Sequence, residues 1–291
     1  MSLLTDTQGT PERVWSCAKA VAAAGGVLDR NDLARLLNPR FVRNGEIRDV
    51  EKAHTQAIGA TVSLDLIELK GGVYVSCAAM ADDYGSFSDQ VHDRLCSIPA
   101  DDPDFLIAEG FAWTVVKTDQ RQSLQWCAGS ADTIAADIEH DIGNPVGGTL
   151  RYNPTKINAW RRWIQFLDLA IELPGNLGLQ PSITGRLMRE LARSELPRET
   201  EIPVQDFLAT IARAMPYVDG GALHAAVAAR MGTTVERRKV SRLMSMALRD
   251  LADDGHIELR VRGDSANTVE LAIDDRPALT VLAVVLNKVS R

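Results

Sequence analysis

Residues 237–273 read RRKVSRLMSMALRDLADDGHIELRVRGDSANTVELAI, a basic helix-like segment that leads into two strand-like runs. Apolar residues recur at helical spacing as far as Gly255, a residue suited to the positive φ at which many helices end. IELRV and TVELAI then alternate about the turn-rich RGDSAN, which predicts a β-hairpin. The segment either reads nucleic acid or is a packing module that carries arginines.

A helical projection divides the predicted helix, residues 236–254, into two faces. The expected core face carries Val240, Leu243, Met244, Ala247 and Leu251. The opposite face and its surroundings carry the predicted DNA-binding residues Arg237, Arg238, Lys239, Arg242, Ser245, Arg249, Arg260 and Arg262. Arginine suits this role because its planar fork pairs with guanine edges and with phosphate. A charged face that only meets water is the alternative.

The overall charge confines any polyanion contact to a local patch. The chain has 291 residues and a formal net charge of −7, with 45% hydrophobic and 24% charged residues. That composition is ordinary for a globular protein with a real core. No run is long and apolar enough to span a bilayer, and no secretory signal opens the chain. We therefore expect a cytoplasmic protein without membrane contact.

Three regions are predicted, at residues 1–80, 81–197 and 198–291. The first region is predicted to have three helices and a hairpin. The helices cover residues 11–24, which end at Gly25-Gly26, residues 31–37, which Asp29 or Asn31 would cap, and residues 45–60. The hairpin strands lie on either side of Gly71-Gly72. The middle is mostly helical, with ADDYGSFSD as a loop and Trp160, Trp163 and Phe166 as core side chains rather than a base-stacking surface. The third repeats the order of the first. The fold class is thus mainly α with small β-hairpins (α+β), with winged-helix modules at both ends of a helical middle.

The two end modules differ in charge. The candidate third helix of the first region mixes Glu46, Asp49 and Glu51 with Arg48 and Lys52. A mixed surface of this kind suits a protein partner or a neighbouring domain better than a phosphate backbone. The apolar ALTVLAVVLNKV near the C-terminus is either the last core element or the contact of a homodimer.

Motifs for catalysis are sparse. The chain has no P-loop, no HExxH and no GxSxG. Glu68 and Lys70 have the ExK form of metal-dependent nucleases, with Asp65 or Asp49 as a further ligand. The isolated histidines, His92 and His224 among them, are expected at the surface or in packing. The four cysteines lie far apart, so we expect no disulfide, no metal site and no cofactor.

Two resemblances bear on function. In SRLMSMALRDLADDGHIELRVRGDSANTVELAI, Leu251, Gly255 and Ile257 follow the L-x-x-x-G-x-I entry into a wing, and the segment resembles the recognition helix and wing of the winged-helix superfamily. MSLLTDTQGTPERVW and RYNPTKINAWRRWIQFLDLA are similar to proteins of bacterial phage-defence and DNA-modification islands, namely the G component (DpdG-like) of the deazapurine-in-DNA cluster. This second resemblance implies an accessory subunit beside an enzyme encoded elsewhere.

These observations predict a non-enzymatic DNA-binding or adaptor subunit of a bacterial DNA-modification or antiviral defence system. Its partners would be double-stranded DNA and the proteins of a multi-subunit system. The first alternative is a protein-interaction subunit whose winged helices dock on a partner, such as an ATPase or an SMC-like complex, without binding DNA. The second is a metal-dependent nuclease that uses Glu68 and Lys70.

Overall fold

The first two helices begin and end where local chemistry predicts. In the computed structural model, α1 (Pro11–Ala23) starts at its proline, and Gly25 and Gly26 follow with φ of 80° and 86°. Side chains of L-residues avoid that region, so the two glycines allow the chain to turn away. Asp29 caps α2 (Arg30–Leu37), because its carboxylate accepts hydrogen bonds from two backbone N–H groups of the first turn.

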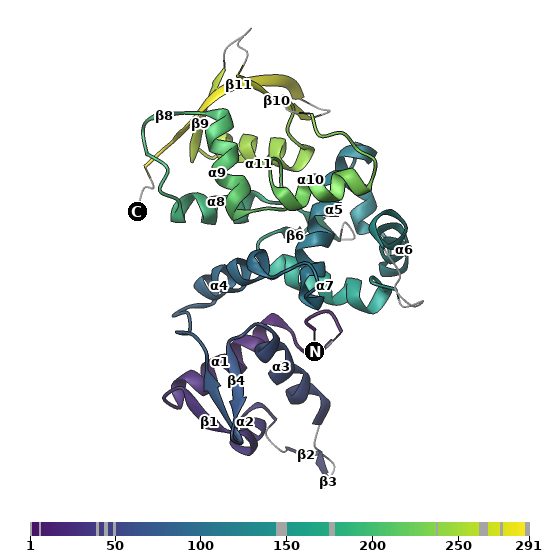
Figure 1. Ribbon diagram of the computed structural model, residues 1–291, viewed down its shortest axis with the longest axis vertical. Coiled ribbons are helices and arrows are strands. Elements are labelled where there is room, and N and C mark those ends of the chain that lie inside the picture. The colour runs from purple at the N-terminus through teal and green to yellow at the C-terminus, as the bar shows by residue number, and fades with distance from the viewer. Residues whose placement is uncertain are drawn as a thin grey trace. The chain divides into compact units, whose positions relative to one another are not determined.

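Most of the chain is described by the structure. The described residues are 2–5, 7–38, 41–43, 46–48, 51–143, 150–174, 178–236, 238–261, 267–273 and 276–288. They form two compact units (Figure 1). The first unit comprises Met1–Ile107 and Pro154–Phe166, and the second comprises Ala108–Asn153 and Leu167–Arg291.

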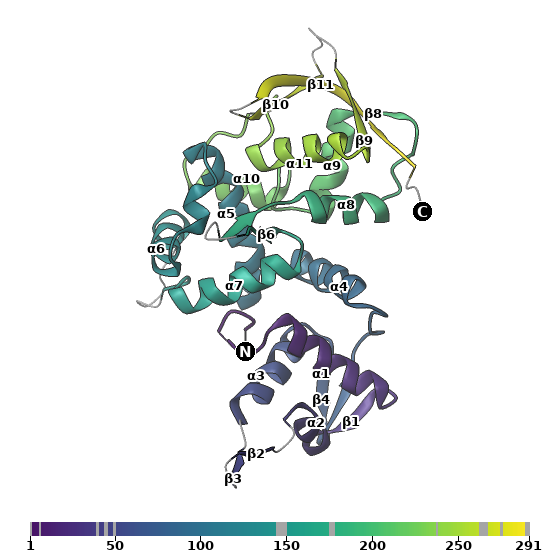
Figure 2. The ribbon, with the colours of Figure 1, turned by 180° about the vertical axis from the view of Figure 1, so that it is seen from behind.

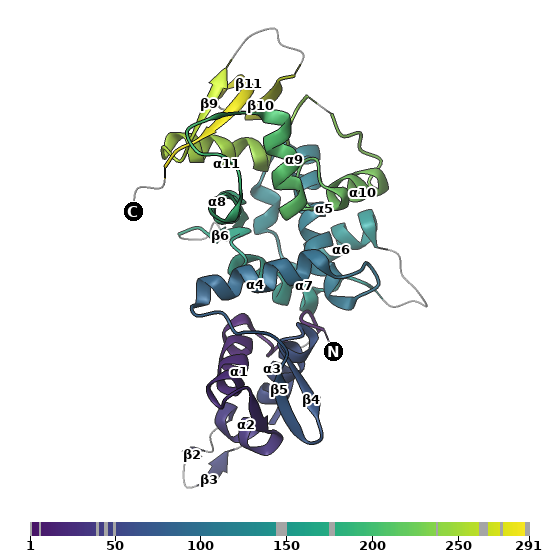
Figure 3. The same ribbon diagram turned by 60° about the vertical axis from the view of Figure 1, so that its left-hand side comes forward.

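The first unit contains a three-stranded antiparallel sheet covered by helices (Figure 3). Its strand order is β1 (Val27–Asp29), β5 (Val73–Ser76) and β4 (Ile67–Lys70), and β4 and β5 form the hairpin predicted about Gly71-Gly72. One core cluster of this unit has side chains from α1, α2, the sheet and α3 (Glu51–Ser63). They are Cys17, Val21, Leu33, Ile58, Ile67 and Tyr74.

Two predictions for this unit are wrong. The helix expected from residue 45 begins at Glu51, and residues 46–48 instead form β3 (Glu46–Arg48), which pairs with β2 (Phe41–Arg43). The expected loop ADDYGSFSD contains the start of α4 (Tyr84–Ser97), because the Asp83 carboxylate accepts from the Ser86 N–H and caps the helix. In both segments local pairing or capping outweighs residue propensity.

Aromatic packing holds α4 to α7 (Pro154–Phe166). The 3₁₀ turn η1 (Pro103–Phe105) follows α4 in the chain. The ring centroids of Phe87 and Phe166 are 5.3 Å apart, and those of Trp163 and Phe166 are 5.8 Å apart. Trp160 and Trp163 are buried, and the Trp160 Nε1–H donates to the Ile107 carbonyl at 3.1 Å. The aromatic residues therefore belong to the core, as predicted.

The second unit is richer in helices. They are α5 (Leu106–Arg121, in this unit from Ala108), the 3₁₀ turn η2 (Gln125–Ala128), α6 (Ala131–Ile142), α8 (Thr184–Arg193), α9 (Val204–Ala214), α10 (Ala222–Arg230) and α11 (Arg242–Asp253). A small hairpin of β6 (Ala170–Glu172) and β7 (Leu179–Pro181) was not predicted. Figure 2 shows α9 and α11 beside the larger sheet, against which both helices pack.

The central strand of that sheet is the apolar C-terminal segment. β11 (Arg276–Leu286) pairs with β9 (Ile257–Val261), β10 (Val269–Ile273) and β8 (Glu201–Pro203). Val281 pairs with both Val261 and Val269, so β11 lies between the two strands that were expected to form one hairpin. That expected pairing is wrong. The segment is a buried core strand, because Val281 and Val284 each pair with a strand on both edges and are themselves buried.

The basic helix is shorter than predicted. α11 begins at Arg242, with Ser241 as N-cap, so residues 238–240 precede the helix and residue 237 lies outside the described part. The Ser241 hydroxyl accepts from the Met244 N–H at 3.2 Å. The expected core face is confirmed, since Val240, Leu243, Met244, Ala247 and Leu251 are all buried. The fold class is α+β, as predicted.

Candidate nucleic-acid surface and ligand pocket

Only part of the predicted basic surface is exposed. Arg238 and Lys239 are both exposed and lie in the segment before α11. Two backbone hydrogen bonds hold this segment to Glu270 of β10: the Glu270 N–H donates to the Arg238 carbonyl at 2.7 Å, and the Val240 N–H donates to the Glu270 carbonyl at 3.3 Å. Arg237 and Arg262 lie outside the described residues. Arg238 and Lys239 are thus presented from a fixed backbone.

Arg242 and Ser245 point into the second unit, which corrects the expected solvent-facing stripe. The Arg242 N–H donates to the Asp119 carboxylate at 2.6 Å, and its guanidinium donates to the Gln122 carbonyl at 3.0 Å. Ser245 is 0% exposed. The helical projection fails here because other parts of the second unit cover the side of α11 that was assigned to water: Arg242 contacts the segment at the end of α5, and α8 packs against α11.

Arg249 and Arg260 are engaged in contacts within the same unit. The Arg249 guanidinium donates to the Leu271 carbonyl at 3.0 Å and to the Pro277 carbonyl at 2.6 Å. Arg260 forms ion pairs with Glu258 at 2.8 Å and Glu201 at 3.5 Å. Any phosphate contact at these positions would have to compete with bonds that already exist.

A pocket of about 200 Å³ lies at the N-terminus of α11. Polar and charged side chains dominate its lining. The lining residues are Val116, Asp119, Gln120, Gln122, Asp219, His224, Ala228, Thr233, Thr234, Val235, Glu236, Lys239, Val240 and Ser241, all in the second unit. The pocket therefore combines side chains that are distant in sequence and that belong to no known motif.

A tight turn positions Asp219 and the start of α10. The Gly221 N–H donates to the Val218 carbonyl at 2.9 Å, and the His224 N–H donates to the Pro216 carbonyl at 3.0 Å. A Cβ at Gly221 would lie 2.2 Å from the Pro216 oxygen, so only glycine fits this position. The turn directs the Asp219 carboxylate to Ser241, whose N–H and hydroxyl donate to it at 2.5 and 2.6 Å.

Burial shifts two pKa values in the pocket. It raises the pKa of Asp119 to about 6, with a further increase from Asp219 that the Arg242 N–H and the Lys239 charge oppose. Burial also lowers the pKa of His224, against an opposing effect of Asp219. The Nδ1 atom of His224 is buried and has no hydrogen-bond partner among the described residues. Desolvated groups that face a cavity are typical of ligand sites.

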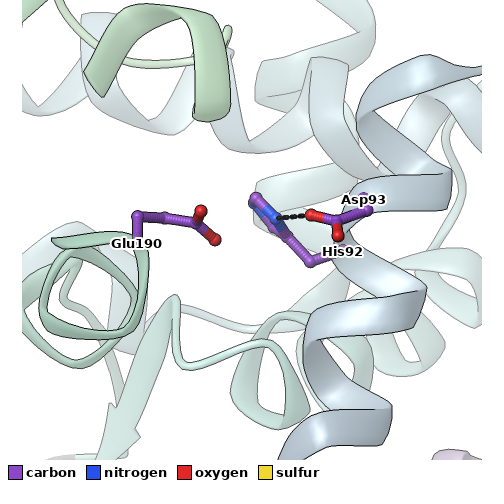
Figure 4. A group of neighbouring side chains, drawn as sticks. All are labelled: His92, Asp93 and Glu190. Atoms are coloured by element: carbon purple, nitrogen blue, oxygen red, sulfur yellow. Dashed lines mark ion pairs between the residues drawn. The ribbon is translucent and has the colours of Figure 1, made fainter. Parts of the chain in front are cut away.

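The other candidates form local contacts. The ammonium of Lys70 is ion-paired with Glu68, Asp65 is ion-paired with Arg94, and Asp49 lies outside the described residues. His92 is buried on α4, and its Nδ1 lies 3.7 Å from the Asp93 carboxylate (Figure 4). Glu190, which Figure 4 also labels, belongs to α8 of the second unit. All four cysteines are free thiols. In the described part of the chain, no helix has the length and apolar composition needed to cross a bilayer.

Comparison with known proteins places the chain in a family. The family model described as DpdG-like matches residues 1–265. The chain therefore belongs to the DpdG-like family, and this membership indicates involvement in a DNA-modification system. No curated protein and no solved structure matches the chain.

Proposed function

We propose that the chain is a non-enzymatic adaptor subunit of a bacterial DNA-modification or defence system, and that it contacts double-stranded DNA through Arg238 and Lys239. One observation carries the proposal: both cations are exposed on a backbone fixed to β10. The Arg238 guanidinium forms no hydrogen bond or ion pair with any described residue. Such a cation is free to neutralise a phosphate.

We also propose a winged-helix module at residues 11–76. The order α1, β1, α2, α3, β4, β5 and the antiparallel strand order β1-β5-β4 support this assignment. The C-terminal module, proposed as winged-helix-like, has three helices followed by β9, but β8 precedes its first helix and β11 separates β9 from β10. The two modules therefore differ in topology as well as in charge.

The alternative is a protein-interaction subunit that does not bind DNA. Burial of Arg242 and Ser245 favours it, since the first turn of a recognition helix must reach base edges in the major groove. With that turn covered by α5, contact with DNA would be limited to the backbone and would carry little sequence specificity. The identity of a protein partner would follow from the other subunits of the system.

The test is duplex-DNA binding by fluorescence anisotropy across a salt series. Arg238→Ala/Lys239→Ala is the test variant, and Arg213→Ala/Lys288→Ala removes the same charge from other exposed positions of this unit. Each lost phosphate contact should reduce the log–log salt slope by roughly 0.9. We expect the slope of the test variant to become shallower by the amount that corresponds to about two lost phosphate contacts, and the slope of the control to stay unchanged. Absence of wild-type binding at low salt would leave the protein-interaction alternative.

A further inference from the structure

We propose that the pocket at the N-terminus of α11 binds a small organic cation of the amidine or amine class. The pocket is a defined cavity of about 200 Å³ within the second unit. The proposal is independent of DNA binding, because it concerns a cavity lined by acidic and amide side chains. Three features of the pocket favour such a ligand: the charge of its lining, the imidazole of His224 without a hydrogen bond at Nδ1, and the apolar residues of its wall.

The charge of the lining favours a cation. Asp119, Asp219 and Glu236 contribute three carboxyl groups, and Lys239 contributes the single ammonium among the described lining residues. The side-chain carbonyls of Gln120 and Gln122 add neutral acceptors. A ligand with several N–H donors can therefore be satisfied at many points of the wall, whereas an anion would meet one lysine and three carboxyl groups.

One lining side chain of the pocket, His224, has a buried nitrogen without a partner among the described residues. His224 is 5% exposed, and the nitrogen is Nδ1. Because burial lowers its pKa, the ring is neutral at pH 7 and does not repel a cation. Asp119 accepts one hydrogen bond at Oδ1, from the Arg242 N–H. A buried polar atom without a partner is costly, and a ligand donor would remove that cost.

The apolar part of the lining sets the size of the ligand body. Val116, Ala228 and Val240 lie among the polar lining residues. A cavity of roughly 150 Å³ holds a benzene molecule, so a pocket of about 200 Å³ accommodates one ring that carries a charged substituent. A planar amidinium would pair with a carboxylate through two N–H groups while its ring packs on the valines.

Cation binding should depend on pH in a defined direction. Asp119 has a pKa of about 6 in the empty pocket, so the carboxyl is largely protonated at pH 5 and ionised at pH 7. The groups that face it are Asp219, Lys239 and Arg242, and His224 lines the same pocket. Protonation of Asp119 removes a negative charge that attracts the cation, and protonation of His224 adds a positive charge that repels it. Affinity should therefore rise between pH 5 and pH 7.

The probe is benzamidine, titrated into the full chain by calorimetry and by NMR at pH 7, with benzamide as the uncharged control of equal shape. A ligand of this size is expected to bind with a dissociation constant on the order of 1 mM. Asp119→Asn should weaken binding at least about tenfold, because it replaces a charge-assisted bond by a neutral one. Asp206→Asn removes the same charge from an exposed position of α9 and should have no effect.

Two more variants make the test independent of folding at Asp119. Glu236→Gln at the exposed edge of the pocket should weaken binding severalfold, and Lys239→Ala should strengthen it, because a like charge is removed. Equal binding of benzamide, no saturable binding of benzamidine at about 10 mM, or binding of inorganic phosphate in its place would overturn the proposal. Thermal unfolding of each variant verifies that the fold is intact.

Discussion

A buried carboxylate, Glu109 of α5, joins three segments of the second unit. It accepts from the Tyr152 hydroxyl at 2.6 Å and forms ion pairs with Arg151 at 2.9 Å and Arg230 at 2.6 Å. The Glu109 side chain is 3% exposed, whereas those of Arg151 and Arg230 are 26% and 38% exposed. A charge this deeply buried is tolerated only because its oxygens are fully engaged.

Glu109→Gln should therefore destabilise the protein. The amide keeps the volume but removes the charge that two arginines share, and breaking a buried pair costs about 3 kcal/mol. Urea unfolding should show a lower midpoint with an unchanged slope. Asp206→Asn is the control for loss of an exposed carboxylate and should shift the midpoint little. A loss for Glu109→Gln no larger than that of the control would contradict the buried-pair argument.

Asp119 should have the opposite effect on stability. Its pKa is raised from 3.8 to about 6 in the folded protein, so the ionised form is disfavoured by folding. The protonated carboxyl group contributes favourably to the free energy of unfolding. This contribution is complete below about pH 4 and is lost as the pH rises through about 6. At pH 7 the charge costs on the order of 2 kcal/mol.

The measurement is the difference in Tm between Asp119→Asn and wild type from pH 4 to pH 8. Asparagine keeps an oxygen for the Arg242 N–H and carries no charge. We expect the variant to be more stable at pH 7–8 and the difference to vanish near pH 4. A difference that does not change with pH would mean that Asp119 titrates as it does in water. Stability lost to a desolvated carboxyl group is common at ligand sites.

At the scale of elements, the N-terminus of α11 is fixed by two aspartates from outside the helix. Ser241 caps the first turn and also donates its hydroxyl to Asp219. Ser241→Ala should cost about 2 kcal/mol, because the cap is lost and a buried carboxylate loses a donor. Ser130→Ala, at the exposed cap of α6, should cost about 1 kcal/mol. Chemical denaturation of both variants tests whether Ser241→Ala loses more stability than Ser130→Ala. Equal losses of stability would show that the contact with Asp219 adds nothing.

The burial of α11 on both sides can be tested at Ser245. This side chain is fully buried, and its hydroxyl has no hydrogen-bond partner among the described residues. Ser245→Ala should leave stability unchanged or higher, because it removes an unsatisfied polar atom. DNA affinity should also stay the same, since the residue cannot reach a ligand. A specific loss of DNA binding would restore the groove-facing role that its sequence position suggested.

At the scale of the whole molecule, the chain enters the first unit twice. One core cluster of residues 1–80 comes from α1, α2, α3 and the small sheet, whereas α4 packs on Trp15 of α1 and on Phe166 of α7. A fragment of residues 1–80 should therefore show cooperative unfolding. A fragment of residues 1–107 should bind the dye ANS, because the aromatic face of α4 is uncovered. Dye binding by the shorter fragment alone would contradict this division.

Local rules in the sequence were sufficient for the elements whose ends depend on single residues. Pro11, Gly25 and Asp29 determine the first two helices, because φ restriction and side-chain capping act within a few residues. The hairpin about Gly71-Gly72 was predictable for the same reason, and the buried tryptophans of α7 were predictable from their helical spacing. The family resemblance was also carried by the sequence, and the DpdG-like match confirms it.

Only the tertiary structure decided how these elements are used. Periodicity identifies the apolar face of α11 but does not reveal that other parts of the second unit, among them α8 and the end of α5, cover the rest of the helix and bury Arg242 and Ser245. Alternation predicts strands but not partners, and the long apolar β11 separates β9 from β10 by pairing with both. Asp119, Asp219 and His224 lie up to 105 residues apart (224 − 119) and carry no motif. Their pocket exists because long-range packing brings α5, the α9–α10 turn and the start of α11 together, and desolvation there gives the carboxyl group its altered pKa.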